Sequence, residues 1–135
     1  MLKKMFFIIL FLMMPLFVFS CSNSQEPVGP PLEGDIADLA EEFIADMHAE
    51  DFNSAVSFFN ADMKKAMSER KLQQNWEAVL AQQGAYEGEI EKHIEESGDY
   101  RAVNIITDFA AGPINIRVVF DGDNRVAGLW FQPVE

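Results

Sequence analysis

The sequence predicts an α+β fold in which N-terminal helices pack on a curved, antiparallel, four-stranded sheet. Three observations lead to this prediction. Up to Gly84, apolar residues recur at three- and four-residue spacing, which is the period of helices. After Gly84, apolar and polar residues alternate, which is the period of strands. Turn-forming residues then divide the second half into consecutive segments, as in an antiparallel meander.

The first helix is expected from Asp35, whose carboxylate suits the N-cap position. The apolar residues that follow form one stripe, and the residues between them are mostly acidic. The stripe comprises Ile36, Leu39, Ala40, Phe43, Ile44 and Met47. We therefore expect one side of this helix to lie on the core and the other to face solvent.

Further helical segments follow the first. A short helix is expected from about Asp51, and Asn60 opens another turn. Ser68 precedes a longer helix in which Leu72, Trp76, Val79 and Leu80 share one face. Gly84 is expected to end that helix, because glycine readily adopts the backbone conformation that closes a helix.

Four strands are expected at residues 86–95, 100–109, 114–120 and 125–131. Their connections, at residues 97–99, 110–113 and 121–124, contain the Gly, Pro, Asn and Asp residues that favour turns. In the first strand one side is expected to carry the alternating polar residues. These are Glu87, Glu89, Glu91, His93 and Glu95.

The second and third strands are expected to pair through their apolar residues. The expected pairs are Val103 with Phe120, Ile105 with Val118, Thr107 with Ile116 and Phe109 with Ile114. For the last hairpin, two-residue and three-residue loops both remain open, and the choice exchanges Trp130 with Leu129 and Phe131. Either choice leaves large apolar side chains on the reverse face of the sheet, which suggests a partner surface.

The N-terminus predicts a lipoprotein signal peptide. Lys3 and Lys4 precede an apolar run at residues 5–19, and Cys21, the only cysteine, follows the small residue Ser20. Secretory signals have a basic start and an apolar core of roughly 7–15 residues, whereas a membrane-spanning helix needs about 20 continuous apolar residues. We therefore expect lipidation of Cys21, against two alternatives: a transmembrane anchor, or a buried thiol.

This interpretation divides the chain into three parts. These are a signal peptide at residues 1–20, a Pro/Gly-containing tether at 21–34 and the α+β domain at 35–135. A stretch of this composition is typical of a semi-rigid spacer. Acyl chains such as palmitate on Cys21 would hold the domain on the cell membrane or the outer membrane, facing away from the cytoplasm.

Charge excludes one class of partner. Without Lys3 and Lys4, 8 basic side chains stand against 22 acidic ones, and nucleic acid requires a basic surface. Half of those 8 are Lys64, Lys65, Arg70 and Lys71, which either form an ordinary solvated helix surface or touch anionic headgroups.

Several short matches resemble a bacterial family of unknown function. They are Tyr100-Arg101-Ala102-Val103, Asn115-Ile116-Arg117-Val118-Val119-Phe120-Asp121 and Val126-Ala127-Gly128-Leu129, with weaker matches over residues 43–52 and 76–84. The resemblance covers about residues 36–133. It implies a nuclear transport factor 2-like fold, a cone of helices over a curved sheet, which in relatives occurs on secreted lipoproteins or ahead of an α/β-hydrolase domain. It also implies pairing of two copies through their sheets.

The sequence marks no catalytic residue, metal site or cofactor. His48 and His93 are candidate general bases. However, Glu50 and Asp51 follow His48 at the end of its helix, and His93 lies on the glutamate side of its strand, as is typical of solvent-exposed histidines. Asp121-Gly122-Asp123-Asn124 resembles a calcium loop, yet the position that needs a carboxylate carries Gln132. The aromatic residues expected to line the cone, either as ligand contacts or as ordinary core, are Phe59, Trp76, Phe109 and Trp130.

Three functions follow from these observations. The first is a lipoprotein with a non-catalytic binding or accessory domain for a small apolar ligand or a peptide. The second is an enzyme with an acid or histidine held inside the cone. The third is a module that only self-associates through its sheet, as a homodimer.

Overall fold

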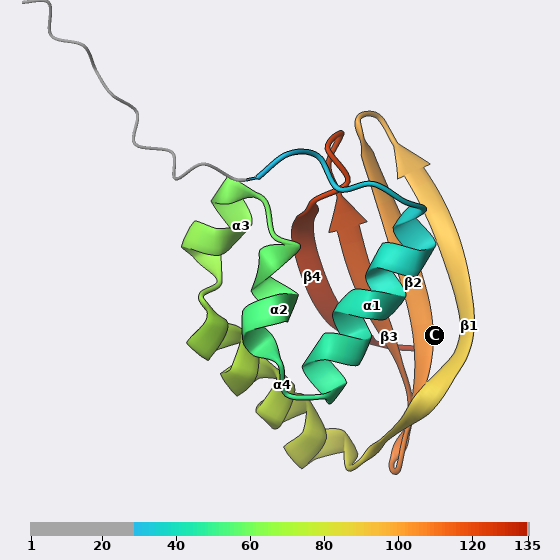
Figure 1. Cartoon of the computed structure of the whole chain (residues 1–135). Coiled ribbons are helices and arrows are strands. Elements are labelled where there is room, and N and C mark those ends of the chain that lie inside the picture. Colours follow the sequence, from blue (N-terminus) through green and yellow to red (C-terminus); the bar gives the residue numbers. More distant parts are fainter. Residues whose placement is uncertain (1–28, 135) are drawn as a thin grey trace, which may run out of the picture.

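Four helices precede four strands along the chain in the computed structural model, which describes residues 29–134. The elements are α1 (Ile36–His48), α2 (Phe52–Ser57), α3 (Ala61–Ala66), α4 (Glu69–Gln83), β1 (Tyr86–Ser97), β2 (Tyr100–Phe109), β3 (Gly112–Phe120) and β4 (Val126–Pro133). The strands form one antiparallel sheet in the order of the sequence. The helices lie together on one face of this curved, unclosed sheet (Figure 1). The predicted α+β fold class is confirmed.

Each helix begins at a side chain that accepts a hydrogen bond from the free backbone N–H groups of its first turn. The cap oxygens lie 2.8 Å from the Ala37 N–H group, 3.1 Å from Ser54, 2.8 Å from Met63 and 3.3 Å from Lys71. The caps are Asp35, Asp51, Asn60 and Ser68. The predicted helix starts are therefore confirmed. Gly84, at φ 81°, closes α4 as expected.

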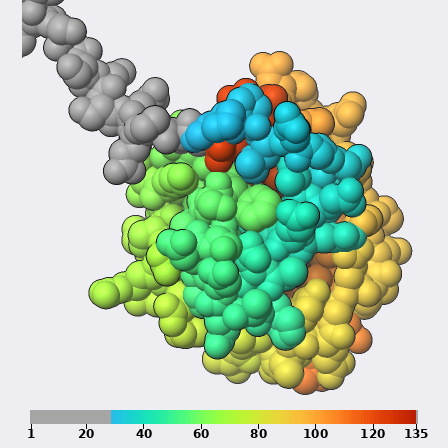
Figure 2. Space-filling view, viewed as in Figure 1, coloured from blue at the N-terminus to red at the C-terminus, as the bar shows by residue number. Residues whose placement is uncertain are grey.

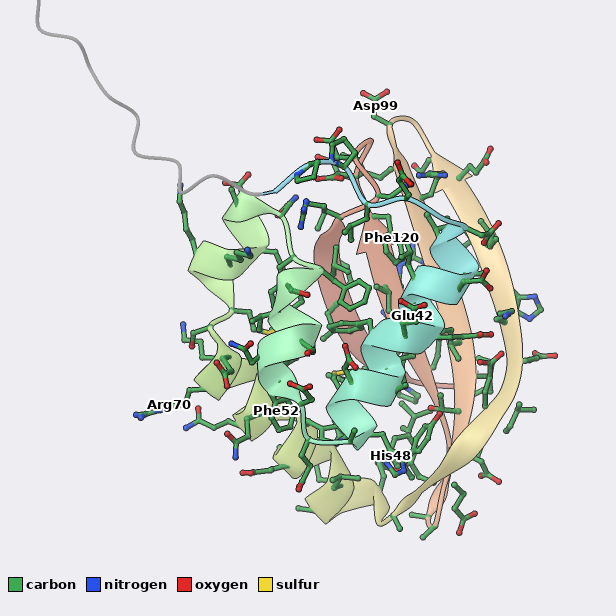
Figure 3. All side chains as sticks on the ribbon, viewed as in Figure 1. Glu42, His48, Phe52, Arg70, Asp99 and Phe120 are labelled. Carbon is green, nitrogen blue, oxygen red and sulfur yellow. The ribbon has the colours of Figure 1, made fainter. Side chains whose placement is uncertain are left out.

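The core lies between the apolar stripe of α1 and the inner face of the sheet. Phe43, Phe59 and Trp76 have almost no exposed surface, and Phe120 points from β3 toward the helices (Figure 3). Burying a side chain of this size stabilises the fold by about 1.5–3 kcal/mol. The helices cover so much of the sheet that little of its inner face is visible from their side (Figure 2).

The predicted pairing of β2 with β3 is wrong by two residues. Val103 lies opposite Val118, and Ile105 lies opposite Ile116. The hairpin turns at two residues, because β3 already begins at Gly112, opposite Phe109. A slip of two leaves every side chain on its expected face, so the hydrophobic pattern alone cannot fix the register.

The predicted faces of β1 are also wrong at one position. The strand is irregular between Tyr86 and Gly88 and again between Glu89 and Glu91. These irregularities place Glu89 opposite Thr107, on the helix side of the sheet. The residues that remain on the open face as expected are Glu91, His93 and Glu95.

The last hairpin turns through residues 121–125, a longer connection than either expected loop. Leu129 and Phe131 lie opposite Val118 and Ile116 on the helix side, so Trp130 lies on the open face. That face carries large apolar side chains, as expected for either loop. They include Tyr100, Ile106, Val119 and Trp130.

The first described residues pack against the connection between β3 and β4. Arg125 is buried and donates to the carbonyl of Pro30 at 2.7 Å and to that of Ser57 at 2.9 Å. The Leu32 N–H group donates to the Asp123 carbonyl at 2.9 Å. The last residues of the expected tether therefore lie on the domain. The predicted signal peptide and Cys21 fall outside the described residues.

Candidate functional site

The four aromatic residues expected to line the cone do not lie together. Trp76 and Phe109 are buried neighbours, with ring centroids 6.0 Å apart. Phe59 is buried against Phe43, with ring centroids 5.8 Å apart. Trp130 is 49% exposed on the opposite face of the sheet. Binding by these residues stays a prediction, but the interior around the first three is occupied by packed side chains.

A pocket of about 230 Å³ opens instead between α1 and the start of β1. We call it the α1–β1 pocket. Glu41, Ile44, Ala45 and His48 recur at the spacing that places residues on one side of a helix, and they form one wall. The opposite wall and the floor come from the sheet. They consist of Tyr86, Glu89 and Ile105.

The irregularity of β1 creates this pocket. In a regular strand Glu89 would share a face with Glu91, which lies on the open side of the sheet. The alternation is broken on both sides of Glu89, between Glu89 and Glu91 and between Tyr86 and Gly88, and Gly88, at φ 137°, lies at the second of these irregularities. The Glu89 carboxylate is thereby brought to the side of α1, near Glu41.

The rim of the α1–β1 pocket is electronegative. Partial burial, with repulsion from Glu41, raises the pKa of Glu89 above its usual value. Partial burial, with the same two carboxylates nearby, also raises the pKa of Tyr86. Lys92 forms an ion pair with Glu41, and this bond raises the pKa of Lys92. The rim therefore already binds an ammonium group, one from its own chain.

The floor of the pocket is aromatic and continuous with the core. The Tyr86 ring lies 5.5 Å from that of Phe109 and 6.1 Å from that of Trp76, measured between centroids. On its other side it lies 4.8 Å from the His48 ring. Two of the predicted ligand residues, Trp76 and Phe109, thus form the layer directly behind Tyr86.

Both histidines are exposed. His48 lies at the end of α1, on the edge of the pocket (Figure 3). His93 lies on the open face, where its Nε2 is 3.1 Å from a carboxylate oxygen of Glu91. Neither histidine is therefore held inside the cone, where the enzyme hypothesis places its acid or histidine.

Residues 40–129 match the model of a protein family described as "Protein of unknown function (DUF3887)". The chain belongs to this family. No curated protein and no solved structure matches the chain. The DUF3887 match includes every residue that lines the α1–β1 pocket.

The open face of this DUF3887 domain carries a second, larger hollow of about 600 Å³. It is lined by Glu91, Ile106, Asn115, Gln132, Pro133 and Val134, of which the last three lie beyond the family match. Beside it, Arg117 donates to Glu95 at 2.5 Å and to Asn104 at 3.1 Å. The polar side chains of this face therefore largely bind one another.

The described part of the chain contains no cluster of three or more His, Asp or Glu side chains suited to a metal ion. The segment that resembles a calcium loop is a turn. Asp121 uses one carboxylate oxygen to accept from the N–H groups of Asp123, at 2.9 Å, and Arg125, at 3.0 Å. Its other oxygen accepts from Asn60 at 3.1 Å. Between residues 29 and 134, no helix has the length and hydrophobicity to cross a bilayer.

The sequence pattern alone does not identify Glu41, Tyr86 and Glu89 as a group. Glu41 and Glu89 are 48 positions apart in the chain, and only tertiary folding brings them together. One signal was available: a glycine inside a strand often marks an irregularity, and Gly88 stands next to Glu89.

Proposed function

We propose that this chain is a lipid-anchored, non-catalytic binding protein. Lipidation of Cys21, a location outside the cytoplasm and a nuclear transport factor 2-like fold belong to this proposal. The signal-like N-terminus supports the first two. Four helices on one face of a curved four-stranded meander support the third.

The anchor has a direct test in the full chain. Cys21→Ala removes the thiol that would accept the lipid, so the variant should lose the acylated species from the membrane fraction. Mass spectrometry of membrane-extracted protein measures this. An acylated N-terminal fragment that persists in the variant would contradict lipidation at this residue.

The ligand we propose is a small molecule, or a peptide side chain, with an apolar body and a cationic amine. One observation carries this proposal: the α1–β1 pocket has an apolar and aromatic floor beneath a rim with two carboxylates, of which Glu41 also pairs with Lys92. Aromatic faces and carboxylates both attract ammonium groups. The pocket volume of about 230 Å³ suits a group the size of one ring with a short chain.

The test compares two probes of similar size and opposite charge. Phenethylamine should raise the melting temperature of the protein, and 3-phenylpropionate should not. At ten times its Kd, a ligand that binds only the folded state stabilises it by about 1.4 kcal/mol. Equal shifts from both probes, or no shift from either, would contradict the proposal.

Two variants locate the effect. Ala45→Trp places a large side chain at the pocket wall and should abolish the phenethylamine shift. Ala78→Trp makes the same change at an exposed position of α4, outside the pocket lining, and should leave the shift intact. Loss of the shift in both variants would show that the amine does not bind at the α1–β1 pocket.

A second candidate function is self-association through the open face of the sheet. Trp130, at 49% exposure, is the observation that favours it, since exposed aromatic residues are enriched in interfaces. Sedimentation of the protein in detergent, with the detergent contribution subtracted, should show a dimer that Trp130→Glu dissociates. A monomer at all concentrations would exclude this candidate.

A further inference from the structure

The basic side chains of the domain are unevenly distributed. Within residues 61–71 there are four of them, against two acidic ones, Asp62 and Glu69. The rest of residues 29–134 has four basic side chains against 18 acidic ones. We call the first four the basic patch. It consists of Lys64, Lys65, Arg70 and Lys71.

The four basic residues elsewhere are already engaged. Lys92 pairs with Glu41, and Arg117 pairs with Glu95. Arg101 donates to Asn124, and Arg125 is buried against backbone carbonyls.

In the basic patch, by contrast, Lys65, Arg70 and Lys71 are exposed. Within the described residues, no ion pair involves any of the four. Lys71 makes only a long hydrogen bond, 3.5 Å, to the carbonyl of Ala66. The charge of the patch is therefore available to an external anion.

The basic patch lies on the side of the molecule where the chain enters the domain. Asn60, which caps α3, donates a hydrogen bond to Asp121. Arg125 donates both to Pro30, in the entering segment, and to Ser57, close before α3. The start of α3 therefore lies beside the entering segment. Arg70 projects outward on that side (Figure 3), and the glutamate-rich strand β1 lies on the opposite side (Figure 1). The domain is thus polarised from a basic end to an acidic one.

We propose that the basic patch contacts the anionic phospholipid headgroups of the membrane to which the chain is anchored. Anionic leaflets attract basic segments within about a Debye length, roughly 8 Å at physiological salt, and repel the acidic remainder of the domain. The nine residues from Cys21 to Gly29 span at most roughly 30 Å, so an anchored domain stays close to the bilayer. This proposal rests on the proposed lipid anchor at Cys21, which brings the basic patch close to the membrane surface.

The experiment uses the full chain reconstituted in vesicles. One set contains phosphatidylcholine alone, and the other contains phosphatidylcholine with 30% phosphatidylglycerol. The protein is pulse-labelled with an amine-reactive acetylating reagent, and peptide mass spectrometry reports each lysine. Lys64, Lys65 and Lys71 should label about fivefold more slowly in the anionic vesicles, which corresponds to about one basic contact each. Lys92, on the opposite side, should label equally in both.

Matched variants assign the effect to charge. Lys65→Gln with Arg70→Gln should restore fast labelling of Lys64 and Lys71 in anionic vesicles. Lys92→Gln with Arg101→Gln removes the same charge elsewhere and should leave the protection unchanged. Protection that persists in phosphatidylcholine vesicles, or in 1 M salt, would overturn the proposal and indicate another partner.

The two proposals fail in different ways. If flotation shows that the chain does not stay with either kind of vesicle, the anchor is wrong. If the chain floats with both kinds and the three lysines label equally in both, the anchor stands and the contact with headgroups is wrong.

Discussion

The two faces of the sheet are formed by the same strands but differ in burial and in polarity. On the helix side, Val103, Ile105 and Ile116 are wholly buried among apolar neighbours. On the open side, Asn104 and Arg117 occupy the alternate positions and bind one another. Alternate residues of β2 and β3 therefore have different roles: one set stabilises the core, and the other set determines the chemistry of the open face. The first half of β1 breaks this alternation, as does the start of β4, and the α1–β1 pocket lies at the irregularity of β1.

The largest expected effect is the difference in the free energy of unfolding between substitutions of the two tryptophans, one on each face. Trp76→Ala removes a fully buried ring from the core and should cost about 3–5 kcal/mol in the free energy of unfolding. Trp130→Ala removes a half-exposed ring from the open face and should cost about 1 kcal/mol or less. Urea denaturation measures both. Equal costs would mean that the two faces do not differ as described.

A smaller effect is expected at Gly128, where Trp130 covers the open face. A Cβ atom built there would lie 2.4 Å from two atoms of the Trp130 ring, so Gly128→Ala must turn that ring outward. A turned side chain costs of order 0.5–1.5 kcal/mol. The emission of Trp130 should shift to longer wavelength.

Gly122→Ala is the matched control, because nothing lies within 4 Å of its added Cβ atom. It should leave the emission and the denaturation midpoint unchanged. An unshifted emission spectrum in Gly128→Ala would show that Trp130 does not lie over Gly128.

The smallest effects concern two glutamates of β1 that face opposite sides. The hydrogen bond from Arg117 lowers the pKa of Glu95, so this residue stabilises the fold above pH 4.5, its ordinary pKa, and loses that effect as the pH falls through the lowered value. Partial burial raises the pKa of Glu89, so its ionisation destabilises the fold as the pH rises through the raised value.

Substitution should therefore act in opposite directions at neutral pH. Glu95→Gln should lower stability at pH 7 and lose its effect toward pH 3. Glu89→Gln should raise stability at pH 7 by less than about 0.5 kcal/mol, because the group is largely solvated, and lose its effect below pH 4.5. Thermal melts across this pH range test both. The same sign for both variants would contradict the placement of Glu89 on the helix side.

The sequence predicts the parts of this fold that depend on local chemistry. The caps Asp35, Asp51, Asn60 and Ser68 act within one helical turn, and their positions were predictable for that reason. The register of β2 with β3 could not be predicted, because a slip of two residues keeps all apolar side chains inward. The faces of Leu129 and Trp130 likewise depend on a loop whose length the pattern leaves open.

The pocket was not predictable for a different reason. Periodicity assigns Glu89 to solvent, and only an irregular strand turns it toward α1. The expected ligand residues were large aromatics, and three of them proved to be core. Large size favours burial in a packed interior as strongly as it favours ligand contact, so aromatic content alone could not distinguish the two roles.

A chemical-shift map of the protein titrated with phenethylamine locates the ligand directly. We expect the ligand to enter at the α1–β1 pocket and not in the filled interior or on the open face. Shifts confined to the backbone amides of residues 41–48 and 86–89, with 3-phenylpropionate inactive, are the predicted result. Shifts centred on Asn115, Trp130 and Gln132, or no shifts at millimolar amine, would contradict it.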